Sequence, residues 1–163
     1  AEMACPVPAT LGAIGDAWRA GTPLLLDNAA AAAAGTWFSR PPVLPNSDDA
    51  AEIIAMSSLL QGTVDRCPGL GLLDVMVEPR IANDNRWGRL VSLAYAQPDQ
   101  LAFGLNAGAA LVITADGAAV LGDGGTFMFD LRAATLALGD NGGYVIANGW
   151  LDVLAAGDTI NHE

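Results

Sequence analysis

Apolar residues recur at helical spacing in two separate parts of the chain. The pattern predicts amphipathic helices over residues 8–20 and 83–96. The apolar positions are Leu11, Ile14 and Trp18 in the first helix and Trp87, Leu90, Val91 and Ala94 in the second. Gly21 follows the first helix and Pro98 the second, and both residue types commonly end helices. These are the two helices that the pattern indicates most clearly.

Continuous apolar runs predict strands that are buried on both faces, as in a parallel sheet. One run is Pro23–Leu26, which ends at Asp27 and Asn28, and a second is Val75–Val77. An alanine run over residues 29–34 follows the first strand directly and is a strong helix former, with Asn28 at the capping position. The sequence therefore predicts a strand-to-helix turn at residues 27–29.

The middle and the end of the chain have a different pattern. Prolines at positions 41, 42 and 45 predict a loop over residues 39–49, and a helix is expected from residue 50 to residue 60. Beyond residue 100, short apolar runs alternate with Gly and Asp turns, and Asp116-Gly117 is a hairpin signal. The predicted strands cover residues 102–105, 109–113, 118–121, 126–130, 144–147 and 150–154.

The order of these elements predicts an α/β fold. We expect a single domain over residues 1–163, with a partial, flavodoxin-like mixed sheet, helices on the faces of the sheet and a β-rich C-terminal half. A doubly wound sheet normally contains several βα units, and only a couple are visible here. We therefore expect the N-terminal half of such a fold to be missing from this chain.

Composition and charge narrow the classes of function. The chain has 163 residues, 52% of them hydrophobic, so it can form a sizeable core. With 18 acidic and 7 basic residues, it carries a formal charge of −11, which would repel nucleic acid. The longest apolar stretch, residues 22–38, is interrupted by Asp27 and Asn28 and is shorter than the roughly 20 residues of a membrane-spanning helix. We expect neither a nucleic-acid partner nor a membrane span.

The termini and cysteines indicate little about chemistry. The chain begins Ala-Glu-Met, so we expect that a signal peptide, a propeptide or another upstream segment has been removed. Cys5 and Cys67 allow one disulfide, or a pair of separate thiols, and neither has the spacing of a metal or redox motif. His162 is close to the end of the chain and is a poor candidate for a general base. We expect no cofactor, and only a weak indication of export.

Several motifs, taken in order, resemble the cyanophycinase and peptidase E-like family of serine peptidases. Residues 18–31, WRAGTPLLLDNAAA, lie where that family has a helix, a buried strand and a Gly-Thr-Ser-Ala-Gly-Ala nucleophile elbow. PGLGLL at 68–73 is similar to the family's Gly-Leu-Gly-Leu strand entry, and NRWGRL at 85–90 to its Arg-x-x-Arg-Leu helix. QPDQLAFGL at 97–105 resembles the family's Pro-Glu-Leu-x-Gly-Leu-Gly-Ile strand, and VLAAGD at 153–158 is similar to its closing strand and Gly-Asp turn. The resemblance covers nearly the whole chain.

The positions that carry catalysis in that family are replaced in this chain. The resemblance places the nucleophilic serine on Ala29 or, with a shift of one residue, on Asn28, and neither side chain can attack an amide. The family's base, in Asp-Gln-His-Phe, falls on Arg80, which cannot accept a proton. The family's acidic cluster becomes Asn106-Ala107-Gly108. We therefore expect no catalytic residue at these degenerate positions.

Three arginines are candidates for a different role near the former site. Arg80, Arg86 and Arg89 could contact an anion there, or could form ion pairs within the domain, for example with Glu78. We favour the ion pairs. The alanine run after Asn28 is interpreted as a closely packed core helix rather than as a remnant of an anion site.

These observations lead to a hypothesis with one main alternative. We expect a non-catalytic, peptidase-like structural or interaction subunit that assembles with another chain supplying the missing half, or with copies of itself. The alternative is an active cyanophycinase-like serine hydrolase that cleaves β-aspartyl or other peptide bonds. A third interpretation is a small-ligand binder that uses Arg80 as an anion contact.

Overall fold

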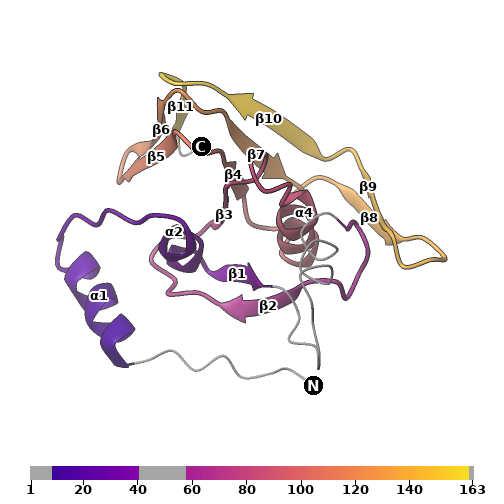
Figure 1. Cartoon of the computed structure of the whole chain (residues 1–163), viewed down its shortest axis with the longest axis horizontal. Coiled ribbons are helices and arrows are strands. Elements are labelled where there is room, and N and C mark those ends of the chain that lie inside the picture. The colour runs from indigo at the N-terminus through magenta and orange to yellow at the C-terminus, as the bar shows by residue number, and fades with distance from the viewer. Residues whose placement is uncertain (1–8, 41–57, 162–163) are drawn as a thin grey trace.

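The computed structural model describes residues 9–40 and 58–161 of the chain (Figure 1). Its helices are α1 (Ala9–Arg19), α2 (Ala29–Ala34) and α4 (Trp87–Ala96). Its strands are β1 (Trp37–Arg40), β2 (Asp65–Pro68), β3 (Met76–Pro79), β4 (Ala102–Leu105), β5 (Ala109–Thr114), β6 (Gly117–Gly122), β7 (Thr126–Asp130), β8 (Thr135–Leu138), β9 (Tyr144–Ala147), β10 (Trp150–Leu154) and β11 (Thr159–Asn161).

The central element is a four-stranded sheet in the order β10-β7-β4-β3. β3 and β4 are parallel, with Met76 opposite Ala102, whereas β7 is antiparallel to both β4 and β10. The chain is therefore a mixed α/β protein with a mixed sheet, as the order of predicted elements indicated. The strand expected at residues 75–77 is confirmed as β3, although it begins at Met76 and ends at Pro79.

Helix α4 contributes to the core beside the parallel strands. Leu90 and Leu93 are fully buried in one cluster with Met76 and Ala102 of the sheet. The indole of Trp87 meets the ring of Phe127 edge-on, with centroids 4.8 Å apart. Because its apolar positions repeat with the helical period, α4 can present them together to the sheet. The helix predicted from this spacing is confirmed, and it stops before Pro98 as expected.

The start of α4 differs from the prediction. Residues 83–86 form a turn instead of a helical segment, and Asn85 has a φ of 53°. The side chain of Asn83 accepts a hydrogen bond from the backbone N–H of Ala107, so it connects this turn to the end of β4. Left-handed backbone does not continue a right-handed helix, so α4 begins only at Trp87.

The C-terminal half is rich in strands, as predicted. β5 and β6 form the hairpin expected at Asp116-Gly117, and β11 pairs with the other edge of β6. β8 and β9 form a second hairpin. The sequence pattern did not indicate β1, β2, β8 or β11. β1 and β2 pair with each other, and neither shows the alternation of polar and apolar residues that marks a half-buried strand.

The strand predicted at residues 23–26 does not form. This segment has no regular secondary structure, and Leu25 is 98% exposed. An apolar run becomes a buried strand only when other strands pair with its backbone, and no described strand does so here. The prediction that residues 23–26 form a buried strand is therefore wrong for this chain.

Two further predictions fall mainly outside the described residues. The helix expected over residues 50–60 lies there except for residues 58–60, which are not helical. Cys67 in β2 is buried and disulfide-bonded, while Cys5, the other cysteine of the sequence, lies outside the described residues, as does His162. Within residues 9–40 and 58–161, no helix is both long and apolar enough to cross a membrane.

Candidate functional site

The turn between the leucine segment (residues 23–26) and α2 contains the most unusual backbone of this region. Asn28 has a φ of 46° and a ψ of −119°, and it lies directly before the first residue of α2. A residue other than glycine rarely adopts this conformation, and such strain is concentrated at functional sites. A strained turn that exposes one side chain before a helix is the geometry of a nucleophile elbow. Asn28 thus has the strained backbone that is expected of an elbow residue, and Ala29 is the first helical residue.

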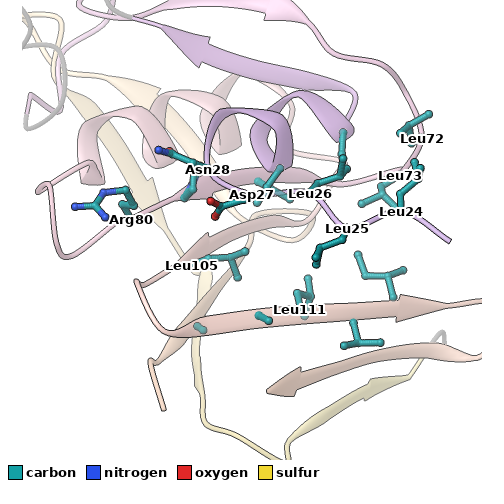
Figure 2. A pocket seen from close by; sticks show the side chains of 18 of the residues that line it. Leu24, Leu25, Leu26, Asp27, Asn28, Leu72, Leu73, Arg80, Leu105 and Leu111 are labelled. Carbon is teal, nitrogen blue, oxygen red and sulfur yellow. The ribbon is translucent and has the colours of Figure 1, made fainter. Parts of the chain in front are cut away.

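Asn28 does not cap the helix that it precedes. Its side chain forms no capping hydrogen bond, contrary to the sequence expectation. The side chain instead lies close to Arg80 and Asp27 at one end of a cavity (Figure 2). A carboxamide is not a nucleophile toward a peptide bond, so the elbow carries no attacking group.

Helix α2 is held tightly at its other end. The backbone N–H groups of Leu70 and Leu72 donate to the carbonyls of Ala33 and Ala34 at 2.7 and 2.9 Å. A side chain at Gly35 would place its Cβ 2.3 Å from the carbonyl oxygen of Val75, so only glycine fits between α2 and β3. Ala32 and Ala34 are buried. The alanine run is therefore a closely packed helix, as expected, and it fixes the position of the elbow.

A cavity of about 850 Å³ opens beside the elbow. One wall is the leucine segment with Asp27 and Asn28, and the opposite wall is β5 (Figure 2). The cavity is also lined by Leu73, Val77 and Leu105, among other apolar residues. Among the described residues that line it, none carries a hydroxyl, thiol or imidazole group, and only Asp27 and Arg80 are ionisable.

Arg80 occupies the position where the family resemblance expects the base. It has a φ of 58° and lies at the end of β3, with its side chain at the polar end of the cavity. Its Nε and Nη2 atoms donate to the carboxylate of Asp84 at 2.8 and 3.0 Å. These hydrogen bonds lower the pKa of Asp84. Arg80 is therefore already paired with an anion of its own chain and, as a permanent cation, supplies no base.

The other two candidate arginines do not line the cavity. Arg89 approaches Glu78 with 3.2 Å between Nε and Oε1, and Arg86 does so with 3.5 Å between Nη1 and Oε1. Arg86 nevertheless lies next to Arg80, because its Nη2 is 2.9 Å from Asp84 Oδ2, an atom of the same carboxylate that Arg80 binds. Asp84 and Glu78 therefore link the three arginines, and of the three Arg80 alone lines the cavity. Glu78 in β3 is the centre of this second cluster.

Ser39 completes the Glu78 cluster, which the sequence pattern did not reveal. Its Oγ donates to Glu78 Oε2 at 2.5 Å and accepts from Arg89 Nε at 2.6 Å. Arg89 also donates to the backbone carbonyl of Ser39 at 2.6 Å. Ser39 and Glu78 are buried, and burial raises the pKa of Glu78, although Arg89, Ser39 and Arg86 act in the opposite direction. The cluster joins β1, β3 and α4, and its hydroxyl faces no opening.

Asn106 marks the place where the resemblance expects an acidic cluster. It lies just after β4 and lines the cavity. Its Oδ1 accepts a hydrogen bond of 3.1 Å from the backbone N–H of Ala82, which fixes the loop after β3. The polar end of the cavity thus contains Asp27, Asn28, Arg80 and Asn106, a set that can hold polar groups but lacks a nucleophile and its base.

Comparison with characterised proteins agrees with the resemblance, over part of the chain. No protein-family model matches. The cyanophycinase of Trichormus variabilis is 36% identical over 101 residues, which are 58% of this chain and 34% of that protein. The cyanophycinase of Synechococcus elongatus is 41% identical over 71 residues, 42% of this chain and 22% of that protein. The matched stretch thus spans about a third or less of these relatives, and over that stretch the chain is related to the cyanophycinases.

Proposed function

We propose that this chain is a non-catalytic relative of the cyanophycinases that acts as a structural or interaction subunit. The observation that carries the proposal is the elbow itself. Its strained backbone is present at Asn28, but the side chain there is a carboxamide. The cavity beside it contains no hydroxyl, thiol or imidazole among the described residues. Acyl transfer needs a nucleophile and a base in contact, and this cavity supplies neither.

The state of the leucine segment supports the assembly part of the proposal. Leu25 is 98% exposed, and no described strand pairs with residues 23–26. Leu25 belongs to a contiguous apolar lining with Leu73 and Leu111, and apolar surface that is contiguous commonly marks an interaction site. The matched stretch covers 34% of the Trichormus relative, so that protein has much further sequence that could form neighbouring strands. We infer a partial, flavodoxin-like sheet in one cyanophycinase-like domain that a partner polypeptide completes.

The alternative is an active serine hydrolase, and one assay separates the two. The purified protein is incubated with cyanophycin and with β-aspartyl dipeptides, beside a characterised cyanophycinase as the positive control. We expect no hydrolysis by the wild-type chain or by Asn28→Ser, because Arg80 cannot take a proton from a serine hydroxyl. Hydrolysis by the wild-type chain, lost on treatment with a serine-directed inhibitor, would refute the non-catalytic assignment.

Assembly is tested on the natively purified protein. Native mass spectrometry followed by denaturing mass spectrometry measures whether a second polypeptide accompanies the chain. We expect a complex with a defined stoichiometry. A lone chain of the mass of this sequence, folded and stable, would contradict the proposed role as an assembling subunit.

A further inference from the structure

The two long walls of the cavity beside Asn28 are both unpaired backbone edges. Within the described part of the chain, residues 23–26 form no backbone hydrogen bond. The opposite wall, β5, is the last strand of the sheet β11-β6-β5 and pairs only with β6. An unpaired strand edge is a template for another strand.

The register of β5 shows which of its backbone groups are available. Leu111 lies opposite Val120 of β6. The N–H of Val120 donates to Asp158, and its carbonyl accepts from Gly157, so both groups point away from β5. In an antiparallel pair, opposite residues share this orientation, so the N–H and C=O of Leu111 point away from β6. All of residues 109–113 line the cavity, although successive side chains of a strand point to opposite faces of the sheet. The edge of β5, and not one of its faces, therefore borders the space between the walls.

The side chains around this space favour an apolar occupant. Leu25 and Leu111 lie on opposite sides of the cavity (Figure 2). Leu25 is almost fully hydrated, although leucine is among the residues that gain most from burial. Charged groups are confined to Asp27 and Arg80 at one end. A chain segment with free N–H and C=O groups could form hydrogen bonds with the unpaired backbone edges. Its apolar side chains could at the same time bury the leucines.

We propose that the cavity is the seat of one apolar β-strand of a partner polypeptide, which pairs with the free edge of β5 at Leu111 and buries Leu25. This inference rests on the proposed function and specifies where and how the partner binds. The strand is assigned to a different polypeptide because a second copy would bring another formal charge of −11, and like charges oppose association. Strand addition of this kind obtains affinity from backbone hydrogen bonds and specificity from alternate side chains.

Hydrogen–deuterium exchange on the natively purified complex and on the re-isolated chain tests the location. We expect the partner to protect the amides of Leu24–Asp27 and of Leu111. A complex whose protection lies elsewhere, for example along the outer edge of β10, would overturn this inference and leave the proposed assembly intact. Purification of the chain alone would overturn both, and protection of the same amides in a dimer of identical chains would overturn the choice of partner.

Two substitutions test the mode of binding. Leu25→Lys places a charge in the apolar space, and we expect it to weaken the complex by about tenfold or more, the loss expected for one buried leucine. Leu111→Pro removes the outward N–H without removing a hydrogen bond to β6, and the same direction of change is expected. Val145→Lys is the matched control, because Val145 is 48% exposed on β9 and does not line the cavity. Equal affinity of wild type and Leu25→Lys would overturn the proposal.

Discussion

Ser39 and Glu78 share a hydrogen bond of 2.5 Å in the interior of the protein, although 39 positions separate them in the chain. Ser39 is 2% exposed and Glu78 is 0% exposed. Arg89 contacts both residues, and Arg86 also contacts Glu78, through the same carboxylate oxygen Oε1. A buried carboxylate is tolerated when it is paired and hydrogen-bonded, so this cluster stabilises the junction of β1, β3 and α4.

We first predict the cost of breaking this cluster. Arg89→Met removes the main partner of Glu78 and keeps most of the apolar volume. Removing one partner of a buried charge costs about 3–5 kcal/mol. Because Arg86 remains 3.5 Å from Glu78, we expect a loss near the lower end of this range in the free energy of unfolding at pH 7, measured by urea titration. Arg132→Met is the control, because its pair with Asp130 is at the surface, and it should cost less than about 1 kcal/mol. Equal losses in both variants would show that the buried cluster contributes no special stability.

The second prediction concerns pH. Burial raises the pKa of Glu78 above 4.5, so the folded state holds this proton more tightly than the unfolded state does. The resulting stability is fully present below pH 4.5 and is lost as the pH rises through the raised pKa. Compared with Glu78→Gln, the wild-type protein should therefore lose relative stability as the pH increases over this window. Urea unfolding of both proteins at a series of pH values gives this difference, and the other titrating groups cancel in it. A difference that changes in the opposite direction would mean that the arginines outweigh burial.

The sequence pattern predicted the parts of the fold that depend on local or repeated spacing. The apolar period identifies α4, and the Asp116-Gly117 turn identifies the hairpin of β5 and β6. Residues 23–26 have the composition of a buried strand, but whether a strand forms depends on distant partners, which a local pattern does not contain. The same applies to β1, whose pairing with β2 joins segments that are far apart in the chain.

The position of the candidate site rests on the resemblance, and its assignment stays a prediction. The resemblance indicated an elbow at Asn28 or Ala29, and only the backbone dihedral angles distinguish them, because a shift of one residue leaves the sequence match almost unchanged. Ser39 offered no signal at all. Its partner Glu78 is 39 positions away in the sequence, and the two residues meet only because β1 and β3 come into contact, so no local pattern indicates the pair.

The strain at Asn28 leads to a third prediction. Glycine adopts positive φ without a steric penalty, and strained positions of this type cost about 1–3 kcal/mol. We expect Asn28→Gly to raise the free energy of unfolding by about 1 kcal/mol after the entropy of glycine in the unfolded chain is taken into account. Thermal unfolding followed by circular dichroism measures the change.

A neighbouring substitution provides the control for this prediction. Ala30→Gly changes a helical residue of α2 to the same amino acid and should destabilise the protein by about 1 kcal/mol. If both glycine variants are destabilised alike, then Asn28 is not strained, and the assignment of the elbow to this residue loses its physical basis.

The final prediction tests the packing between β4 and α4. A Cβ atom at Gly104 would lie 2.9 Å from Ile81 Cδ1 and 3.1 Å from Leu90 Cδ2, and both of these side chains are fully buried. Gly104→Ala should therefore destabilise the protein by about 1 kcal/mol or more, as overpacking of a filled core does. Ile81→Val removes Cδ1, so the double variant should be less destabilised than the sum of the two single variants.

Gly12→Ala in α1 is the control, because a Cβ there meets no atom within 4 Å and alanine favours the helix by up to about 1 kcal/mol. Urea unfolding measures the effects of the single variants and of the double variant. Strictly additive effects of Gly104→Ala and Ile81→Val would show that the side chain of Ile81 does not limit how closely the loop after β3 packs on β4.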